Sequence, residues 1–281
     1  MSNTIFTAPG CSRCKITKRY MDERGIPYVD LDIKGDGKEA FSQFYRNNRG
    51  VVVRGKEGIE FPVFTDGKTI RQGVGVVIAY LHTGTKLDGS IGPSELSHGW
   101  MDGIHVSGGN PLLVDELVAV LSFIKRNGLH LQLDTDGRNA AVLEKLLEHG
   151  LGDRVLMDIK GPLSLYRRTL GLELDPIEVK KTIELVVRFP EYKFRTTIAP
   201  IVREETSRKI GYLTPEEVGE IARLIHEVTG NHKQPYVLRV FDPETCADER
   251  LKSLEKLSPD ALFAHRSAAR RHQVSTEIEK T

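Results

Sequence analysis

The sequence predicts an α/β fold made of two successive domains. Three observations predict it: strands and helices alternate within residues 1–83, a glycine-rich stretch follows at 84–102, and five strand-like segments then alternate with amphipathic helices within 103–262. Strict alternation of strand and helix is typical of parallel βα units. With 281 residues the chain can form two domains that each bury a core. The last stretch, 263–281, is polar, and we expect it to be mobile.

Composition argues against several classes of protein. The 40 Lys and Arg residues nearly balance the 39 Asp and Glu residues, and no long block of one sign is present, which argues against a nucleic-acid scaffold. No apolar stretch approaches the roughly 20 residues that span a bilayer. The first ten residues lack the basic and apolar pattern of a secretory signal. We therefore expect a cytoplasmic protein with no membrane partner.

The first domain is predicted from a few short patterns. Residues 4–8 and 28–33 have the pattern of strands, and residues 12–24 between them have that of a helix. Further helices are expected at 37–48 and 74–81. They flank a hairpin within 60–70 that turns at Asp66-Gly67.

Two of the three cysteines, Cys11 and Cys14, stand at CxxC spacing at the start of the first predicted helix. This spacing fits either thiol–disulfide chemistry or half of a zinc site. Cys246 is the remaining cysteine, and no nearby histidine completes a zinc site. A structural, unreactive cysteine pair is the third alternative. At a helix N-terminus the unpaired amides and the dipole favour a thiolate, and Arg13 and Lys15 add positive charge.

The stretches TIFTAPGCSRCKITKRYMDERGIPYVDLDI and FPVFTDG resemble the glutaredoxin and thioredoxin family, most closely the small redoxins that serve ribonucleotide reductases. The resemblance implies a thioredoxin-like domain over 1–83. It implies that Cys11 is the nucleophile, that Cys14 is the resolving thiol, and that Pro62 is cis and lies against the pair. The acidic pair with which many glutaredoxins hold glutathione has no counterpart in RQGVGVVIAY (71–80). A donor of the thioredoxin-reductase or ferredoxin-linked type is therefore expected.

The second domain is predicted from repeated strand and helix patterns after the expected linker, 84–102. Helices are expected at 112–127 and 139–149, and two more begin at Asp175-Pro176 and Thr214-Pro215. The expected strands are 103–107, 130–134, 154–159, 193–199 and 236–241. Ligands bind beyond the carboxyl ends of parallel strands, where SGGNP, DTDG and MDIKG fall. Unpaired backbone amides, carboxylates and a lysine at the same edge of the sheet could bind a small zwitterionic ligand.

The order HVSGGNPLL, LDTDG, VLMDIKG and YRRTLGL resembles the S-adenosylmethionine radical enzymes that activate glycyl-radical enzymes. The resemblance implies a partial (βα) barrel of parallel strands. It also implies an S-adenosylmethionine site, with the associated cation near its carboxylates. The residues matched to that site are Gly108, Gly109, Asn110 (where the family usually has Glu), Asp134, Asp158 and Lys160.

The family's cluster motif, CxxxCxxC, is not present in the sequence. The stretch 84–102 is also too short for a strand, a cluster loop and a crossover helix. We therefore expect no iron–sulfur cluster, no required cofactor and no radical chemistry by this chain alone.

Together these features predict a thiol–disulfide oxidoreductase with a degenerate second domain. That domain docks a partner, or binds S-adenosylmethionine without cleaving it. The resemblance suggests that the client disulfide belongs to a glycyl-radical enzyme such as anaerobic ribonucleotide reductase. Two alternatives stay open: a non-enzymatic module that senses S-adenosylmethionine or redox state, and an accessory subunit of a radical activating enzyme.

Overall fold

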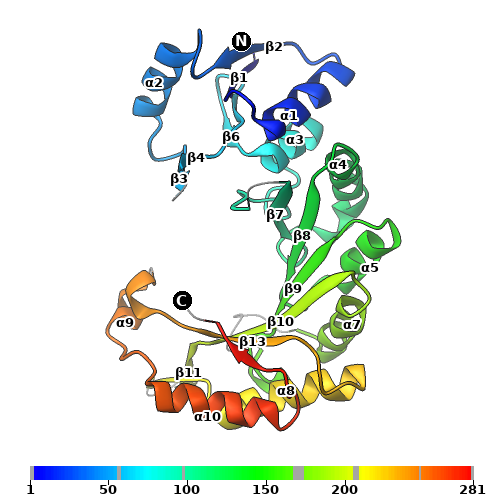
Figure 1. The fold of residues 1–281 in the computed structure, drawn as a ribbon, viewed down its shortest axis with the longest axis vertical. Coiled ribbons are helices and arrows are strands. Elements are labelled where there is room, and N and C mark those ends of the chain that lie inside the picture. Colours follow the sequence, from blue (N-terminus) through cyan, green and yellow to red (C-terminus); the bar gives the residue numbers. More distant parts are fainter. Residues whose placement is uncertain are drawn as a thin grey trace. The chain divides into compact units, whose positions relative to one another are not determined.

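The computed structural model describes residues 3–55, 58–96, 99–166, 174–204, 209–246 and 248–279 (Figure 1). By its contacts the chain divides into two units. Unit 1 is Met1–Leu133 with Glu148–Asp153, and unit 2 is Asp134–Leu147 with Arg154–Thr281. The first boundary between the units falls between Leu133 and Asp134.

Unit 1 begins with a mixed four-stranded sheet of order β2-β1-β5-β6. Strand β1 pairs with β2 in parallel and with β5 antiparallel, and β5 pairs with β6 antiparallel. This is the thioredoxin-like arrangement that the sequence predicted. Its elements are β1 (Asn3–Thr7), α1 (Ser12–Glu23), β2 (Tyr28–Asp32), α2 (Lys38–Asn47), β3 (Arg54–Gly55), β4 (Gly58–Ile59), β5 (Val63–Thr65), β6 (Ile70–Gln72) and α3 (Val74–Thr83).

The expected turn chemistry is present in this first part. The carboxylate of Asp66 accepts the backbone N–H groups of Thr69 and Lys68 at 2.7 and 2.8 Å and closes the β5–β6 hairpin. These bonds, with one from the Tyr80 hydroxyl, hold the pKa of Asp66 well below its usual range. Phe41 of α2 is buried against Phe6, with ring centroids 5.1 Å apart. The aromatic side chains of this helix therefore form part of the core.

Residues 84–102 were expected to be a linker, and much of this stretch packs within unit 1. Leu87, Ser90 and Ile91 are buried, and Ile91 pairs with Ile104 in an antiparallel bridge. The amide of His105 donates to the carbonyl of Ser90 at 2.8 Å. The glycines and the proline suggested a flexible segment, but Gly92 lies close to Gly103 of β7, and the buried side chains of Leu87 and Ile91 anchor the segment. We call residues 84–96 the packed segment.

The second sheet has the order β14-β13-β10-β9-β8-β7 and contains the expected series of strands. Strand β10 pairs in parallel with β9 and β13, and β13 with β14, as in a partial (βα) barrel. From β7 to β9 its elements are β7 (Trp100–His105), η1 (Pro111–Leu113), α4 (Val114–Arg126), β8 (His130–Thr135), α5 (Ala140–Glu148) and β9 (Arg154–Asp158). Unit 2 continues with η2 (Leu163–Leu165), α7 (Pro176–Val186), β10 (Glu191–Ile198), β11 (Pro200–Glu204), β12 (Lys209–Tyr212), α8 (Pro215–Thr229), β13 (Tyr236–Val240), η3 (Pro243–Thr245), α9 (Glu249–Lys252), α10 (Pro259–Arg270) and β14 (Glu277–Ile278).

The C-terminal stretch 263–281, expected to be mobile, is ordered over its described residues. It contains most of α10 and all of β14. His265 is buried, and its Nε2 lies 2.7 Å from the carbonyl of Leu213. The side chain of buried Gln273 accepts from the amide of Gln234 at 2.9 Å. These polar side chains therefore bond to backbone groups elsewhere in unit 2 instead of to water.

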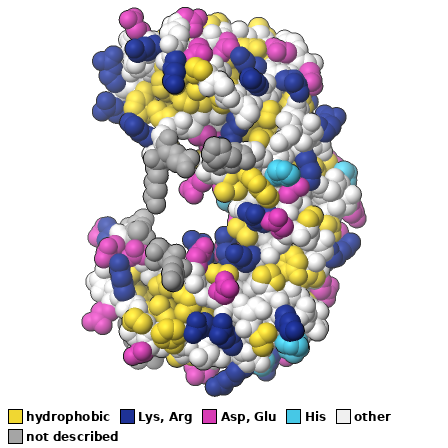
Figure 2. Space-filling view, in the orientation of Figure 1, with side chains coloured by type: hydrophobic (Ala, Val, Ile, Leu, Met, Phe, Trp, Pro, Cys, Tyr) yellow, Lys and Arg dark blue, Asp and Glu magenta, His cyan; other side chains and the backbone are white. Residues whose placement is uncertain are grey.

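Charges of both signs are interspersed on the face that Figure 2 shows, as the balanced composition predicted. Within the described part of the chain, no helix is both long and apolar enough to cross a membrane.

Candidate functional site

The two cysteines of the CxxC motif form a disulfide in this structure. Cys11 is the N-cap of α1, and the amide of Cys14 donates to its sulfur at 3.0 Å. Cys14 is 2% exposed, whereas Cys11 is half-buried, so Cys11 is the more accessible residue of the pair. A helix N-terminus stabilises a thiolate on Cys11 once the disulfide is reduced.

The loop before β5 lies against this disulfide. The Cys11 sulfur is 3.8 Å from the carbonyl oxygen of Phe61. The Phe61–Pro62 peptide bond is cis, as the redoxin resemblance implied. The structure therefore brings Cys11, Cys14 and the backbone of the Pro62 loop together.

Arg13 was expected to add positive charge beside Cys11, but its guanidinium is engaged by other groups. It donates to the Glu60 carboxylate at 2.6 Å and to the Trp100 carbonyl at 2.5 Å. Burial, opposed by the Arg13 charge, raises the pKa of Glu60 to about 7. The only signal for this pair in the sequence was an acidic residue in the otherwise apolar run IEFPVF.

The glycine-rich motif follows β7 in unit 1 and lies against the packed segment. A Cβ atom placed on Gly108 would overlap the Gly89 carbonyl oxygen, and one on Gly109 would overlap the Ser90 Oγ. The Asn110 side chain accepts from the Leu112 amide at 3.0 Å and caps η1. Close approach of the chain to itself accounts for both glycines here.

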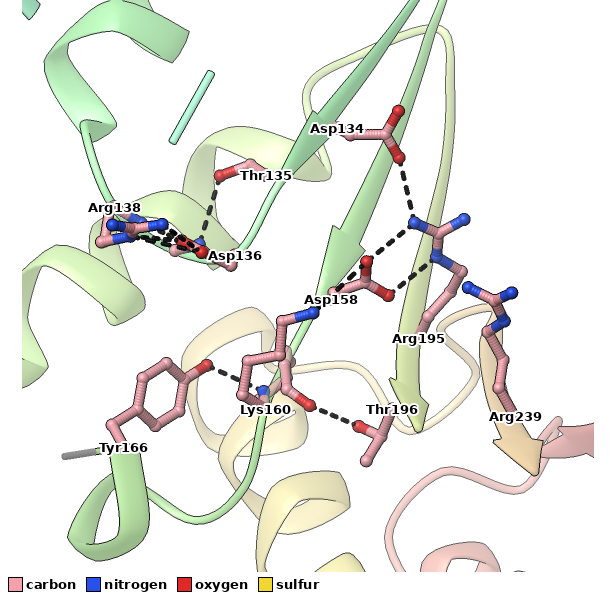
Figure 3. Close-up of polar contacts among 12 residues, drawn as sticks. Asp134, Thr135, Asp136, Arg138, Asp158, Lys160, Tyr166, Arg195, Thr196 and Arg239 are labelled. Atoms are coloured by element: carbon pink, nitrogen blue, oxygen red, sulfur yellow. Dashed lines mark hydrogen bonds and ion pairs between the residues drawn. The ribbon is translucent and has the colours of Figure 1, made fainter. Parts of the chain in front are cut away.

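The acidic residues of the predicted ligand site gather around an arginine that the sequence interpretation missed (Figure 3). The Arg195 guanidinium donates to Asp158 through two bonds of 2.9 Å and to Asp134 at 3.0 Å. The Lys160 ammonium lies 3.7 Å from the Asp158 carboxylate. Asp134, Asp158 and Lys160 therefore lie near one another, as predicted. The prediction did not include Arg195, which bonds to both carboxylates.

The charges of this cluster compensate one another. Two carboxylates face one guanidinium and one ammonium, and the Arg195 side chain is 15% exposed. Burial lowers the pKa of Arg195, but the charges of Asp158 and Asp134 outweigh burial and raise it. A guanidinium thus lies where the resemblance placed an external cation. The signal in the sequence was an arginine in the middle of a predicted strand, KFRTTIA.

Uncharged groups hold the backbone beneath the cluster. Thr196 donates to the Ile159 carbonyl at 2.9 Å and accepts from the buried Tyr236 hydroxyl at 2.9 Å. The Lys160 amide donates to the Tyr166 hydroxyl at 3.4 Å. These bonds fix the ends of β9 and β10, from which the charged side chains project.

A cavity of about 280 Å³ borders Lys160, with Ile201, Ile210 and Leu251 among its lining residues. The motif YRRTLGL, which supported the second resemblance, lies largely outside the described residues because 167–173 are not among them.

The thiols of this chain do not fit an iron–sulfur cluster. Such clusters are held by several cysteine thiolates. The sequence has three cysteines, and two of them are joined in the disulfide of unit 1.

Residues 3–51 match the family model named Glutaredoxin. The chain is also 26% identical over 159 residues to a putative glycyl-radical enzyme activating enzyme of Methanocaldococcus jannaschii, in a match that covers 54% of this chain and 60% of that protein. These matches confirm both resemblances inferred from the sequence. Because the chain spans about 60% of that relative, the relative's activity does not transfer as a whole.

Two solved structures are also similar. A domain of pyruvate-formate lyase-activating enzyme from Bacteroides vulgatus has a TM-score of 0.43 and 14% identity, over 63% of this chain and 98% of that one. HMG-CoA lyase from Brucella melitensis has a TM-score of 0.39 and 13% identity, over 64% of this chain and 58% of that one.

Proposed function

We propose that this chain is a thiol–disulfide oxidoreductase in which Cys11 attacks and Cys14 resolves. The observation that carries the proposal is the Cys11–Cys14 disulfide at the N-terminus of α1, beside the Pro62 loop, in a segment that matches the glutaredoxin model. Cys11 is the more exposed residue of the pair, which supports its role as nucleophile.

The electrons balance in two exchange steps. The Cys11 thiolate attacks one sulfur of the client disulfide, forms a mixed disulfide and releases the first client thiolate. The Cys14 thiolate then attacks the Cys11 sulfur, which forms the disulfide seen here and releases the second client thiolate. Two electrons pass to the client, and an external dithiol or reductase of the thioredoxin-reductase or ferredoxin-linked type restores the thiols.

Anaerobic reduction of insulin disulfides, with dithiothreitol as the donor, tests this function. Wild type should accelerate the reduction, Cys11→Ser should abolish the acceleration, and Cys246→Ser should leave it unchanged. Cys14→Ser should accumulate the mixed disulfide because the resolving thiol is missing. A wild-type rate equal to that of dithiothreitol alone, or an unimpaired Cys11→Ser variant, would refute the proposal.

We further propose that the second part of the chain docks the client, a glycyl-radical enzyme such as anaerobic ribonucleotide reductase. Similarity to an activating enzyme supports this class of client, because such enzymes act on glycyl-radical enzymes. The test is reduction of the purified, oxidised reductase, followed by counting its released thiols. Saturation with client and a lower KM than for insulin are expected. Equal efficiency on both disulfides would argue against docking.

The alternative, a module that binds S-adenosylmethionine, predicts a different result by calorimetry. Ser90 and Gly89 cover the sides of Gly108 and Gly109 on which a Cβ would lie, and Arg195 already neutralises the nearby carboxylates. These contacts favour docking over ligand sensing. We expect no heat of binding at S-adenosylmethionine concentrations up to about 1 mM. A dissociation constant of that size corresponds to a binding free energy of about −4 kcal/mol. Micromolar binding would make the sensing module the leading proposal.

A further inference from the structure

Arg13 ties the CxxC turn to two other segments of unit 1. Its guanidinium donates one hydrogen bond to the carboxylate of Glu60, the residue before Phe61. It donates another to the backbone carbonyl of Trp100 at the start of β7. The Arg13 and Glu60 side chains are only 12% and 18% exposed, so water screens this ion pair weakly. Both halves of the redox site, the cysteine turn and the Pro62 loop, therefore share one largely buried ion pair.

The charged and polar groups around Glu60 come from several elements. Arg13 of α1 supplies positive charge, Asp102 of β7 supplies negative charge, and the Ser94 backbone donates a hydrogen bond to the carboxylate. The Gln72 side chain of β6 donates to the Glu60 backbone carbonyl at 3.2 Å. Burial outweighs the Arg13 charge, so the carboxyl group changes its ionisation near neutral pH.

We propose that Glu60 is a positioning residue of the redox site, which holds Arg13 in place and sets the thiolate population of Cys11 through its own charge. This inference rests on the proposed function. The chain itself links this ion pair to the thiols, because Arg13 lies between Cys11 and Cys14, and Glu60 directly precedes Phe61, whose carbonyl oxygen is 3.8 Å from the Cys11 sulfur.

The sign of the effect follows from the charges. When Glu60 is protonated it is neutral and no longer balances the positive charge of Arg13. That positive charge then favours the thiolate form of Cys11. When Glu60 ionises as the pH rises through about 7, its negative charge opposes that thiolate. The reactivity of Cys11 should therefore rise with pH less steeply than that of an isolated thiol.

The test is the rate of alkylation of Cys11 by iodoacetamide between about pH 4 and 10, in the reduced full chain carrying Cys14→Ser and Cys246→Ser. In this background Cys11 is the one cysteine left in the sequence. The chain with Glu60 intact should give a shallow, two-step profile. Glu60→Gln should give a single step whose pKa is lower by about 0.5–1 unit. Glu60→Asp should restore the two steps, and Glu39→Gln, an exposed control, should change nothing.

Superimposable profiles for the chain with Glu60 intact and for the Glu60→Gln variant would overturn the inference. Thermal unfolding of each variant verifies that it is folded, and Glu60→Ala, which also removes the carboxylate, takes the place of Glu60→Gln if that variant does not fold. The two proposals fail separately. If the profiles differ but wild type does not reduce insulin, the proposed function fails. If wild type reduces insulin but the profiles coincide, the role of Glu60 fails.

Discussion

At the scale of single residues, two arginines form largely buried ion pairs with side chains that are distant in the sequence. Arg13 pairs with Glu60, and Arg195 pairs with both Asp134 and Asp158. They respond differently to pH, because burial penalises the charge of Glu60 whereas the partners of Arg195 stabilise it as a cation.

Glu60 should make the protein less stable as the pH rises. Its pKa is raised in the folded state from 4.5 to about 7, so the folded chain holds this proton more tightly than the unfolded chain. The stabilisation is full below pH 4.5 and is lost as the pH rises through about 7. Between about pH 5 and 8.5, wild type should lose about 2–3 kcal/mol more than Glu60→Gln in urea unfolding. Parallel curves for the two proteins would contradict the expectation.

Arg195→Met should destabilise unit 2 by about 2–4 kcal/mol, because it leaves two partly buried carboxylates without their shared guanidinium. Lys160→Met is the matched control. Its ammonium is 3.7 Å from Asp158 and the side chain is 36% exposed, so a cost below about 0.5 kcal/mol is expected. The measurement is chemical denaturation of both variants at about pH 7. Equal losses would mean that Arg195 is not the dominant partner.

At the scale of elements, specific contacts hold the packed segment 84–96, which is part of the stretch expected to be a linker. It pairs with β7 through the Ile91–Ile104 bridge and fits against Gly108 and Gly109. A short antiparallel contact therefore holds this segment against part of β7.

Gly109→Ala should destabilise the chain by about 1–3 kcal/mol, because the new methyl group would overlap the Ser90 side chain. Ser90→Gly removes that side chain and should recover part of the loss in the double variant. Gly50→Ala is the control, since a Cβ there meets no atom within 4 Å. A double-mutant cycle by thermal or urea unfolding measures the coupling. Additive losses would show that the two positions do not touch.

At the scale of the whole molecule, the redoxin part and helix α4 share one compact unit. Tyr20 of α1 packs edge-on against Phe123 of α4 with centroids 4.9 Å apart, and Arg24 lies 3.7 Å from the centre of the Tyr20 ring. The Tyr20 hydroxyl also lies 3.0 Å from His82 Nδ1. These contacts attach the redox site to a fixed support within unit 1 instead of to the end of a flexible tether.

Phe123→Ala should therefore weaken α4 and the redoxin part together. Loss of the ring should cost about 3–4 kcal/mol. In native-state hydrogen exchange, the amides of β1 and of α4 should lose protection by similar free energies, because a cooperative unit opens as a whole. Leu112→Ala, at an 88% exposed position, should leave both unchanged. A loss confined to α4 would show that the redoxin part unfolds independently.

The sequence by itself determined much of the local structure, including the position of the two CxxC cysteines at the start of a helix. Periodicity, caps and turn residues placed α1, α7, α8 and the Asp66 hairpin correctly, because these signals act between residues close in the chain. The CxxC motif and its helix start are equally local.

Only the tertiary structure decided which distant charged residues form ion pairs and which polar or glycine-rich stretches pack against the rest of the fold. Arg195 enters between Asp134 and Asp158, and Glu60 meets Arg13, across separations that no periodicity encodes. The packed segment and the stretch around His265 looked mobile because their composition is glycine-rich or polar. They are ordered because their few apolar side chains and their hydrogen bonds find partners elsewhere in the fold, and the energy of those contacts exists only once the chain has folded.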